Sequence, residues 1–463
     1  MMGKQKLLKN IRSLVSCDAF DTVYSDCDLL INGYKIEQIG KNLSSKEAEV
    51  IDGRNYFVYP GLVNTHHHFF QTFVRNLVTI DYPNMLVVDW LDKIYPIFAQ
   101  IDSDVIYYSS LVAMADLLKH GCTTAFDHQY CYTKKTGKEA IDRQMEAASL
   151  LGIRYHAGRG CNTLEREKGS TIPYEMLEST DEFLLDCERL IKAYHDPNPN
   201  SMRQIVVAPC QPINSYQETF RDSVTFARKH GVRLHTHLGE GENPIMLERY
   251  GKRTLSWAEE IGFIGKDVWF AHGWELQKDE YRTMANSGTG LSHCPAPAVL
   301  GGFPIIDIPA MTKTGMCISL GCDGSATNDS SNLLDSLRMA YLAQSYQSKS
   351  RGGAPSAYGM LKVATNNGAK TLGRDDIGSL EEGKAADLFA IDATTLPLAG
   401  TLHDPKNLLA RIGYTGEVAM TMVGGNIVYK DGKLKGIDET SLASEAEQVC
   451  SERLRSLFPK IFM

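Results

Sequence analysis

Apolar runs that read as short strands alternate with helix-like stretches through the middle of this 463-residue chain, and this alternation most restricts its fold. Helix-like stretches such as 181–194 and 215–230 separate the runs. Strands that alternate with helices predict a parallel sheet, and eight units predict a closed (β/α)8 barrel, or TIM barrel, of the α/β class. With an opening strand at 60–66, the runs are 123–128, 154–160, 205–210, 233–238, 268–273, 290–295 and 317–323.

An open doubly wound sheet is the alternative architecture for such a pattern. It is disfavoured because no glycine-rich phosphate-binding sequence follows the first strand. The connection at 296–314, between the seventh and eighth strands, looks irregular and is the weakest part of the barrel prediction.

Both ends of the chain read as short strands and turns. Asn32-Gly33 in the first part and Gly424-Gly425 in the last are hairpin signals. We therefore expect the two ends to pair into one small β-sandwich beside the barrel. The expected segments are 1–59 for the first part of the sandwich, 60–376 for the (β/α)8 barrel, 377–436 for the second part and 437–463 for a C-terminal helix.

Composition excludes several classes of protein. The formal net charge of −8 argues against nucleic acid and anionic membranes as partners. Eleven cysteines without a CxxC pair indicate reduced thiols, and therefore a cytoplasmic protein. The chain has neither an apolar run of about 18 residues nor a signal peptide pattern, so we expect no transmembrane helix and no secretion.

Titratable side chains recur where the predicted strands end. In a barrel of this kind the carboxyl ends of all strands meet at one rim, which carries the active site. Residues on alternate positions of a strand share a face, so one face at the end of the first strand carries two imidazoles. The residues at the rim are His66, His68, His235, His237, Glu240, His272, His293 and Asp323.

Such a set suits a metal-dependent hydrolase. Histidine binds zinc and other first-row metals, and three histidines with one carboxylate leave a position for water. A divalent metal lowers the pKa of bound water to about 7. Asp323 could bind the metal and orient or deprotonate the water, while Glu240 is placed to shuttle a proton as a general acid–base. His272 could stabilise charge that develops on the attacking oxygen.

The motifs also match a known family. The chain resembles the amidohydrolase superfamily, in its cytosine-deaminase-like, mononuclear branch, and the match looks closest to 8-oxoguanine deaminase and the s-triazine hydrolases. The motifs that carry the resemblance are PGLVNTHHHFFQT at 60–72, HTHLGE at 235–240, AHG at 271–273, DGSATNDSSNLL at 323–334 and IGSLEEGKAADL at 377–388.

The resemblance implies a specific set of site residues. The metal ligands would be His66, His68, His237 and Asp323, with Glu240, His272 and Asp323 as catalytic residues. His235 lies one pleat deeper, and we interpret it as interior packing. The fourth strand offers no bridging lysine, which favours one divalent ion per chain, zinc first and iron(II) as the alternative.

The implied reaction is hydrolytic deamination of a small aminated heterocycle. An oxidised purine such as 8-oxoguanine ranks first, and removal of chloride or an alkylamine from an s-triazine, or deamination of a pterin, is the alternative. The retained Asp323 favours deamination over the triazine reaction. A noncatalytic scaffold would require loss of ligands, and none is lost. From the resemblance we also expect a homodimer. Candidate substrate contacts are Gln71, Trp90, Gln211 and Asn328, an indole and three amides that suit a flat ring with polar edges.

Overall fold

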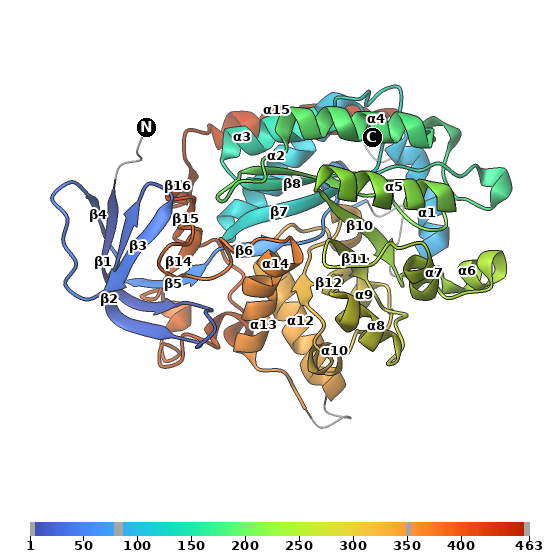
Figure 1. Ribbon diagram of the computed structural model, residues 1–463. Coiled ribbons are helices and arrows are strands. Elements are labelled where there is room, and N and C mark those ends of the chain that lie inside the picture. The colour runs from blue at the N-terminus through green and yellow to red at the C-terminus, as the bar shows by residue number, and fades with distance from the viewer. Residues whose placement is uncertain (1–4, 78–86, 349–352, 458–463) are drawn as a thin grey trace.

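The computed structural model describes residues 5–77, 87–348 and 353–457, and its centre is the predicted barrel (Figure 1). Within these residues, eight strands pair in parallel and in chain order, from β6 to β13. The predicted (β/α)8 barrel is thereby confirmed. The strands are β6 (Leu62–Asn64), β7 (Cys122–Gln129), β8 (Arg154–Arg159), β9 (Arg203–Val207), β10 (Arg233–Leu238), β11 (Val268–His272), β12 (Gly290–His293) and β13 (Ile318–Leu320).

Main-chain hydrogen bonds close the barrel between its first and last strands. The Thr65 N–H donates to the Leu320 carbonyl at 3.1 Å, and the Asp323 N–H donates to the His66 carbonyl at 3.1 Å. These bonds lie at the carboxyl ends of β6 and β13. They therefore fix the two chain segments that carry His66 and Asp323 side by side.

Helices surround the barrel, and some of them begin at a residue whose side chain caps the first turn. Ser179 and Glu182 form a capping box at the start of α4, which satisfies amide groups that have no partner inside the helix. The connection at 296–314 contains two short helices. The helices are α1 (Val87–Phe98), α2 (Ser103–Lys119), α3 (Ala140–Leu151), α4 (Thr180–Tyr194), α5 (Gln217–His230), α6 (Asn243–Tyr250), α7 (Thr254–Glu260), α8 (Glu280–Ser287), α9 (Pro295–Leu300), α10 (Ile308–Lys313), α11 (Ser325–Asn328), α12 (Leu333–Ser348), α13 (Ala357–Ala364) and α14 (Asn366–Thr371).

The two ends of the chain meet in a second sheet at one side of the barrel, as predicted (Figure 1). Among the described residues its nine strands form one continuous sheet, because β5 pairs with β1 on one edge and with β14 on the other. Its apolar face has a core of its own, which includes Leu29, Val58 and Met420. The strands are β1 (Lys6–Val15), β2 (Val23–Asn32), β3 (Lys35–Gly40), β4 (Glu49–Asp52), β5 (Tyr56–Pro60), β14 (Leu388–Asp392), β15 (Met420–Val423), β16 (Asn426–Lys430) and β17 (Lys433–Leu434).

A buried ion pair ties this sheet to the barrel. Arg154, the first residue of β8, donates from Nε to Asp387 Oδ2 at 2.6 Å, and Asp387 Oδ1 also accepts from the Gly424 N–H at 2.7 Å. Both side chains are almost fully buried. Paired charges are tolerated there because each satisfies the other's hydrogen bonds.

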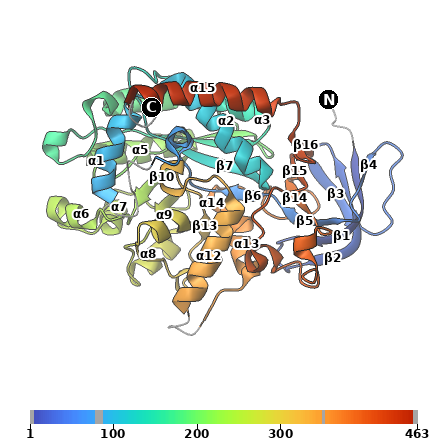
Figure 2. The ribbon, with the colours of Figure 1, turned by 180° about the vertical axis from the view of Figure 1, so that it is seen from behind.

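The last helix, α15 (Glu439–Leu457), crosses back over the barrel and lies along α2 (Figure 2). Residues 1–4 and 458–463, the outer ends of the expected first and last segments, lie outside the described residues. Within the part of the chain that is described, the helices include none with the length and apolarity to cross a membrane.

Candidate metal centre and active site

The chain leaves β6 through three histidines that point in two directions. His66 and His68 are buried and face the barrel axis, where their rings lie 4.7 Å apart. His67 turns the other way. Its Nδ1 accepts from the His68 N–H, so its Nε2–H donates to Ser331 Oγ at 2.9 Å. The tripeptide thus supplies two convergent imidazoles and one structural imidazole.

Four ligand atoms converge at the carboxyl ends of β6, β10 and β13. Nε2 of His68 lies 3.1 Å from Nε2 of His237 and 3.3 Å from Oδ1 of Asp323. Nε2 of His66 lies 3.4 Å from the same carboxylate oxygen. The structure therefore brings together all four residues that the resemblance implies as metal ligands.

The hydrogen bonds of these rings leave the converging nitrogens bare. His68 Nδ1 donates to the His128 carbonyl at 2.9 Å, and His237 Nδ1 donates to the Cys210 carbonyl at 2.7 Å. Burial holds the pKa values of His66 and His237 well below the ordinary value, which favours neutral rings. Each neutral ring that donates from Nδ1 presents a lone pair at Nε2.

These atoms fit a divalent metal. His66 Nε2 is buried and, among the described residues, has no hydrogen-bond partner. Metal–ligand bonds of about 2.0–2.2 Å allow atoms this close together to share one ion, and three of the separations are 3.1, 3.3 and 3.4 Å. Burial acts to raise the pKa of Asp323, but its contacts with His66 and His68 outweigh burial and lower the pKa well below its usual range. The carboxylate is thus available as an anionic ligand.

Glu240 and His272 lie beside this cluster. Oε1 of Glu240 lies 3.4 Å from Nε2 of His272, and Oε2 accepts from Gln211 Nε2 at 3.0 Å. Burial raises the pKa of the Glu240 carboxyl well above its usual range, and the charges of Asp323 and Glu242 raise it further. A carboxyl with a raised pKa can carry a proton near neutral pH and pass it on, as a general acid–base does.

Two of these residues adopt a backbone conformation that side chains rarely take. His272 has φ of 76° and Asp323 has φ of 64°, both in the left-handed region. For a residue other than glycine this conformation costs about 1–2 kcal/mol. Strain of this kind persists where the surrounding structure imposes it, often at active sites. Here it turns both side chains from strand ends β11 and β13 toward the same point.

Two further carboxylates hold the loop that carries Glu240. Glu242 accepts from the main-chain N–H groups of Gly239 and Glu240, both at 2.6 Å. Glu275 accepts from the N–H groups of Gly241 and Asn243 at 3.2 and 3.1 Å. These contacts fix the direction in which Glu240 leaves the strand. Neither residue could be singled out from the sequence, because loop hydrogen bonds of this kind have no spacing signature.

The four residues expected to contact the substrate differ in their surroundings. Gln211 donates from Nε2 to the carboxylate of Glu240, the candidate general acid–base. The Gln71 amide accepts from the Ala326 N–H at 3.2 Å and donates to the Tyr130 hydroxyl at 3.3 Å. Asn328 donates to the main-chain carbonyls of its own loop at Cys322 and Ser330. Trp90 is buried on α1. The structure therefore places Gln211 against the candidate catalytic residue Glu240, and all four substrate contacts remain predictions.

The family comparison agrees with this geometry. Residues 57–428 match the sequence pattern described as the amidohydrolase family, and they span the barrel together with most of β5, all of β14 and β15 and part of β16 in the second sheet. The chain belongs to the amidohydrolase family. The predicted enzyme class, a hydrolase acting on carbon–nitrogen bonds, is thereby confirmed.

The similarity to individual proteins extends over nearly the whole amidohydrolase chain. It is 48% identical over 454 residues to hydroxydechloroatrazine ethylaminohydrolase of Pseudomonas sp. (strain ADP), covering 96% of this chain and 94% of the relative. It is 36% identical over 408 residues to 8-oxoguanine deaminase of Pseudomonas aeruginosa, covering 87% of this chain and 89% of that relative. The crystal structure of atrazine chlorohydrolase from Arthrobacter aurescens TC1 complexed with zinc superimposes with a TM-score of 0.90 at 29% identity. The superposition covers 96% of this chain and 99% of the chlorohydrolase chain.

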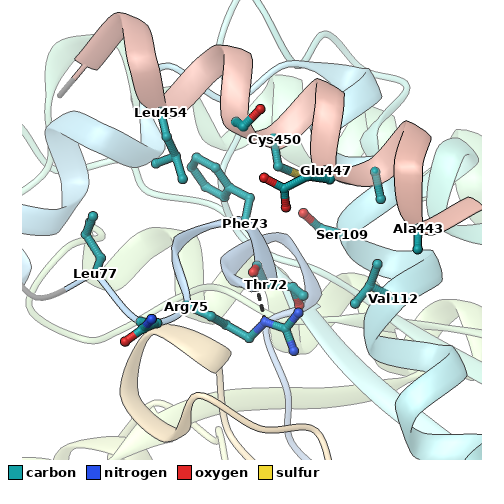
Figure 3. Close-up of a pocket in the computed structure, with 13 residues that line it drawn as sticks. Thr72, Phe73, Arg75, Leu77, Ser109, Val112, Ala443, Glu447, Cys450 and Leu454 are labelled. Carbon is teal, nitrogen blue, oxygen red and sulfur yellow. Dashed lines mark hydrogen bonds between the residues drawn. The ribbon is translucent and has the colours of Figure 1, made fainter. Parts of the chain in front are cut away.

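A separate cavity of about 580 Å³ lies between η1 (Phe69–Val74), α2 and α15. Figure 3 shows Thr72 and Arg75 on one side of it and Ser109 and Glu447 on the other. None of the four candidate ligands lines this cavity. It is therefore distinct from the histidine cluster of the amidohydrolase.

Proposed function

We propose that this amidohydrolase is a metal-dependent hydrolytic deaminase that releases ammonia from an aminated, oxo-substituted heterocycle, with an oxidised purine such as 8-oxoguanine as the first candidate. One observation carries the proposal: Glu240 and His272 lie 3.4 Å apart beside the converging ligand atoms of His68, His237 and Asp323. This arrangement combines a metal site with a proton carrier.

The chemistry follows from the positions of these groups. A divalent metal at this site would lower the pKa of water enough for attack near neutral pH. Water adds to the ring carbon that bears the amine, the carbon–nitrogen bond breaks, and the amine leaves with a proton. Glu240 is the group that moves protons from the attacking water to a ring nitrogen and to the leaving amine. The imidazole of His272 contacts Glu240 and can stabilise charge on the attacking oxygen.

We propose zinc as the resident metal, at about one ion per chain, with iron(II) as the alternative. The donor set of three imidazoles and one carboxylate supports zinc, since zinc accepts both nitrogen and oxygen ligands. The chlorohydrolase structure complexed with zinc supports the same choice. Iron remains the alternative because imidazole and carboxylate ligands also suit it.

A second candidate is removal of ethylamine from a hydroxylated triazine. It is favoured by the 48% identity to hydroxydechloroatrazine ethylaminohydrolase. Both reactions break a bond between a ring carbon and an exocyclic nitrogen, so the same groups serve either one. Loss of chloride from a triazine and deamination of a pterin are further outcomes of the same test.

The test is a panel of substrates with purified, metal-loaded protein. Comparing kcat/KM for 8-oxoguanine, isoxanthopterin, an ethylamino-hydroxytriazine and a chlorotriazine, with identification of the released product, separates the candidates. We expect ammonia from the oxidised purine. If a chloro- or alkylamino-triazine is preferred by more than about tenfold, or about 1.4 kcal/mol in transition-state binding, the purine assignment is wrong. The fold and the metal site would survive that result.

We also propose a free base as substrate, a cytoplasmic location and a homodimer, with neither nucleic acid nor membrane as partner. The sequence has no basic cluster suited to a phosphate group, and the formal net charge of −8 argues against polyanionic partners. Light scattering on the purified protein tests the dimer. Comparing activity on a free base with activity on the nucleotide of the same base tests the preference for a free base.

A further inference from the structure

We propose that His235 is a positioning residue that sets the tautomer of His66 and thereby prepares His66 Nε2 to bind the metal. The proposal rests on the metal site of the proposed function. It assigns a specific role to a side chain that the strand position alone suggests is interior packing.

The hydrogen-bond chain through His235 has a defined direction. Nδ1 of His235 lies 2.9 Å from the Trp269 carbonyl oxygen, which can only accept, so this nitrogen carries a hydrogen. In a neutral ring the other nitrogen, Nε2, is then an acceptor. It lies 3.0 Å from Nδ1 of His66. The hydrogen between the two rings therefore belongs to His66 Nδ1, and His66 Nε2 is left with its lone pair toward the other ligands.

The surroundings of His235 leave it little freedom. The side chain is fully buried, and its ring centroid lies 4.7 Å from those of both Phe126 and Trp269. The His128 ring lies 5.1 Å away on another side. A ring enclosed in this way cannot turn away from His66 without displacing packed aromatic groups. The hydrogen bond is therefore part of the folded structure with or without metal.

His66 differs from the other two histidine ligands in this respect. His68 and His237 donate from Nδ1 to main-chain carbonyls, of His128 and Cys210 respectively, which side-chain substitution does not remove. His66 relies on the side chain of His235 instead. Groups that orient a metal-binding histidine typically contribute about 10- to 100-fold to metal affinity. The role can thus be tested by changing one side chain outside the ligand set.

Two substitutions at one position separate the acceptor from the packing. His235→Phe keeps a ring of similar shape but removes the acceptor, whereas His235→Gln can place its amide oxygen near the position of Nε2. His128→Phe is the matched control, since the His128 ring packs against that of His235 but donates from Nε2 to the Ala208 carbonyl. Its ring nitrogens make no hydrogen bond to a ligand among the described residues. The measurements are the zinc dissociation constant by chelator competition and the absorption spectrum of the cobalt-substituted protein.

We expect His235→Phe to weaken zinc binding by about 10- to 100-fold and to change the cobalt spectrum, because His66 loses its acceptor. The zinc dissociation constants of His235→Gln and His128→Phe should stay within about threefold of that of the unaltered protein, and their cobalt spectra should be unchanged. Unchanged affinity and spectrum in His235→Phe would overturn the proposal, as would an equal loss in His128→Phe. Thermal unfolding of each metal-free variant identifies losses caused by misfolding.

A measurement on the unaltered, metal-free protein does not depend on any variant folding. Nitrogen-15 spectra of the histidine side chains should place the hydrogen on His66 Nδ1 and show a coupling across the hydrogen bond to His235 Nε2. A hydrogen on His66 Nε2 would contradict the proposal. Failure of the unaltered protein to bind any divalent metal would instead contradict the proposed function, since the coupling is read without metal.

Discussion

Nε2 of His68 and Nε2 of His237 face each other at 3.1 Å, although both rings donate from their opposite nitrogen to a main-chain carbonyl. Two lone pairs at this distance repel unless a cation or a proton lies between them. The fold thus places two bare imidazole nitrogens against each other at the end of the barrel. A bound divalent ion removes that repulsion and should stabilise the native state.

The first prediction concerns the ligands. Purified protein should hold about one divalent ion per chain, and His66→Ala and His237→Ala should lose it, because each removes a converging nitrogen. His67→Ala is the control and should retain the ion, since His67 points toward Ser331. Elemental analysis of the three variants measures this. A stable centre of two ions, or metal loss in His67→Ala equal to that in His66→Ala, would contradict the assignment.

The second prediction separates chemistry from metal binding. Glu240→Gln preserves the size of the side chain but removes the group that carries protons. General acid–base groups typically contribute about 10²- to 10⁴-fold in rate, so kcat should fall by at least 100-fold while metal content stays unchanged. Steady-state kinetics with elemental analysis of the same sample measures both. Near-normal turnover would remove Glu240 from the mechanism.

The third prediction concerns stability and pH. Asp127 accepts from the Phe69 N–H, directly after His68, and from Gln144 Nε2 at 2.7 Å. Burial raises the pKa of Asp127 to about 7, whereas an unfolded aspartate has a pKa of about 3.9. As the pH rises from about 4 to about 7, the unfolded chain releases this proton before the folded chain does. The free energy of unfolding should therefore fall over this range, by about 1.4 kcal/mol for each unit of pKa difference.

Asp127→Asn should flatten this dependence, because the amide does not titrate in that range. The oxygen of the asparagine amide can still accept from the Phe69 N–H. The Gln144 amide can turn over so that its oxygen accepts from the new NH2 group. Urea unfolding of both metal-free proteins at several pH values gives the comparison. Parallel curves for the two proteins would show that Asp127 titrates normally in the fold.

The convergence of the candidate ligand residues could be predicted because strands that end at one rim of a barrel bring their last side chains together. Once His66, His237 and Asp323 are assigned to strand ends, the shared rim of the barrel brings them together. The strand runs are likewise visible as short apolar segments bounded by turn residues. The motifs at 60–72 and 235–240 then distinguish this family from other barrels with polar rims.

Hydrogen-bond partners could not be predicted in the same way. Alternation along β10 indicates that His235 lies one pleat below His237, but it does not reveal the 3.0 Å contact between His235 and His66. That contact joins side chains from β10 and from the segment after β6, and no strand pairing sets their register because β6 and β10 are not neighbours in the sheet. Asn328 illustrates the same limit, because its amide donates to the carbonyls of its own loop and no spacing rule encodes loop hydrogen bonds.

The measurement that most directly tests metal-dependent hydrolysis is stoichiometric reconstitution of the metal-free protein. Zinc is added in fractions of an equivalent while ammonia release from 8-oxoguanine is followed. We expect no turnover without metal, a linear rise in turnover as zinc is added, and a plateau at about one equivalent per chain. Full turnover by the metal-free protein, or a plateau at two equivalents, would contradict the proposed single-metal deaminase.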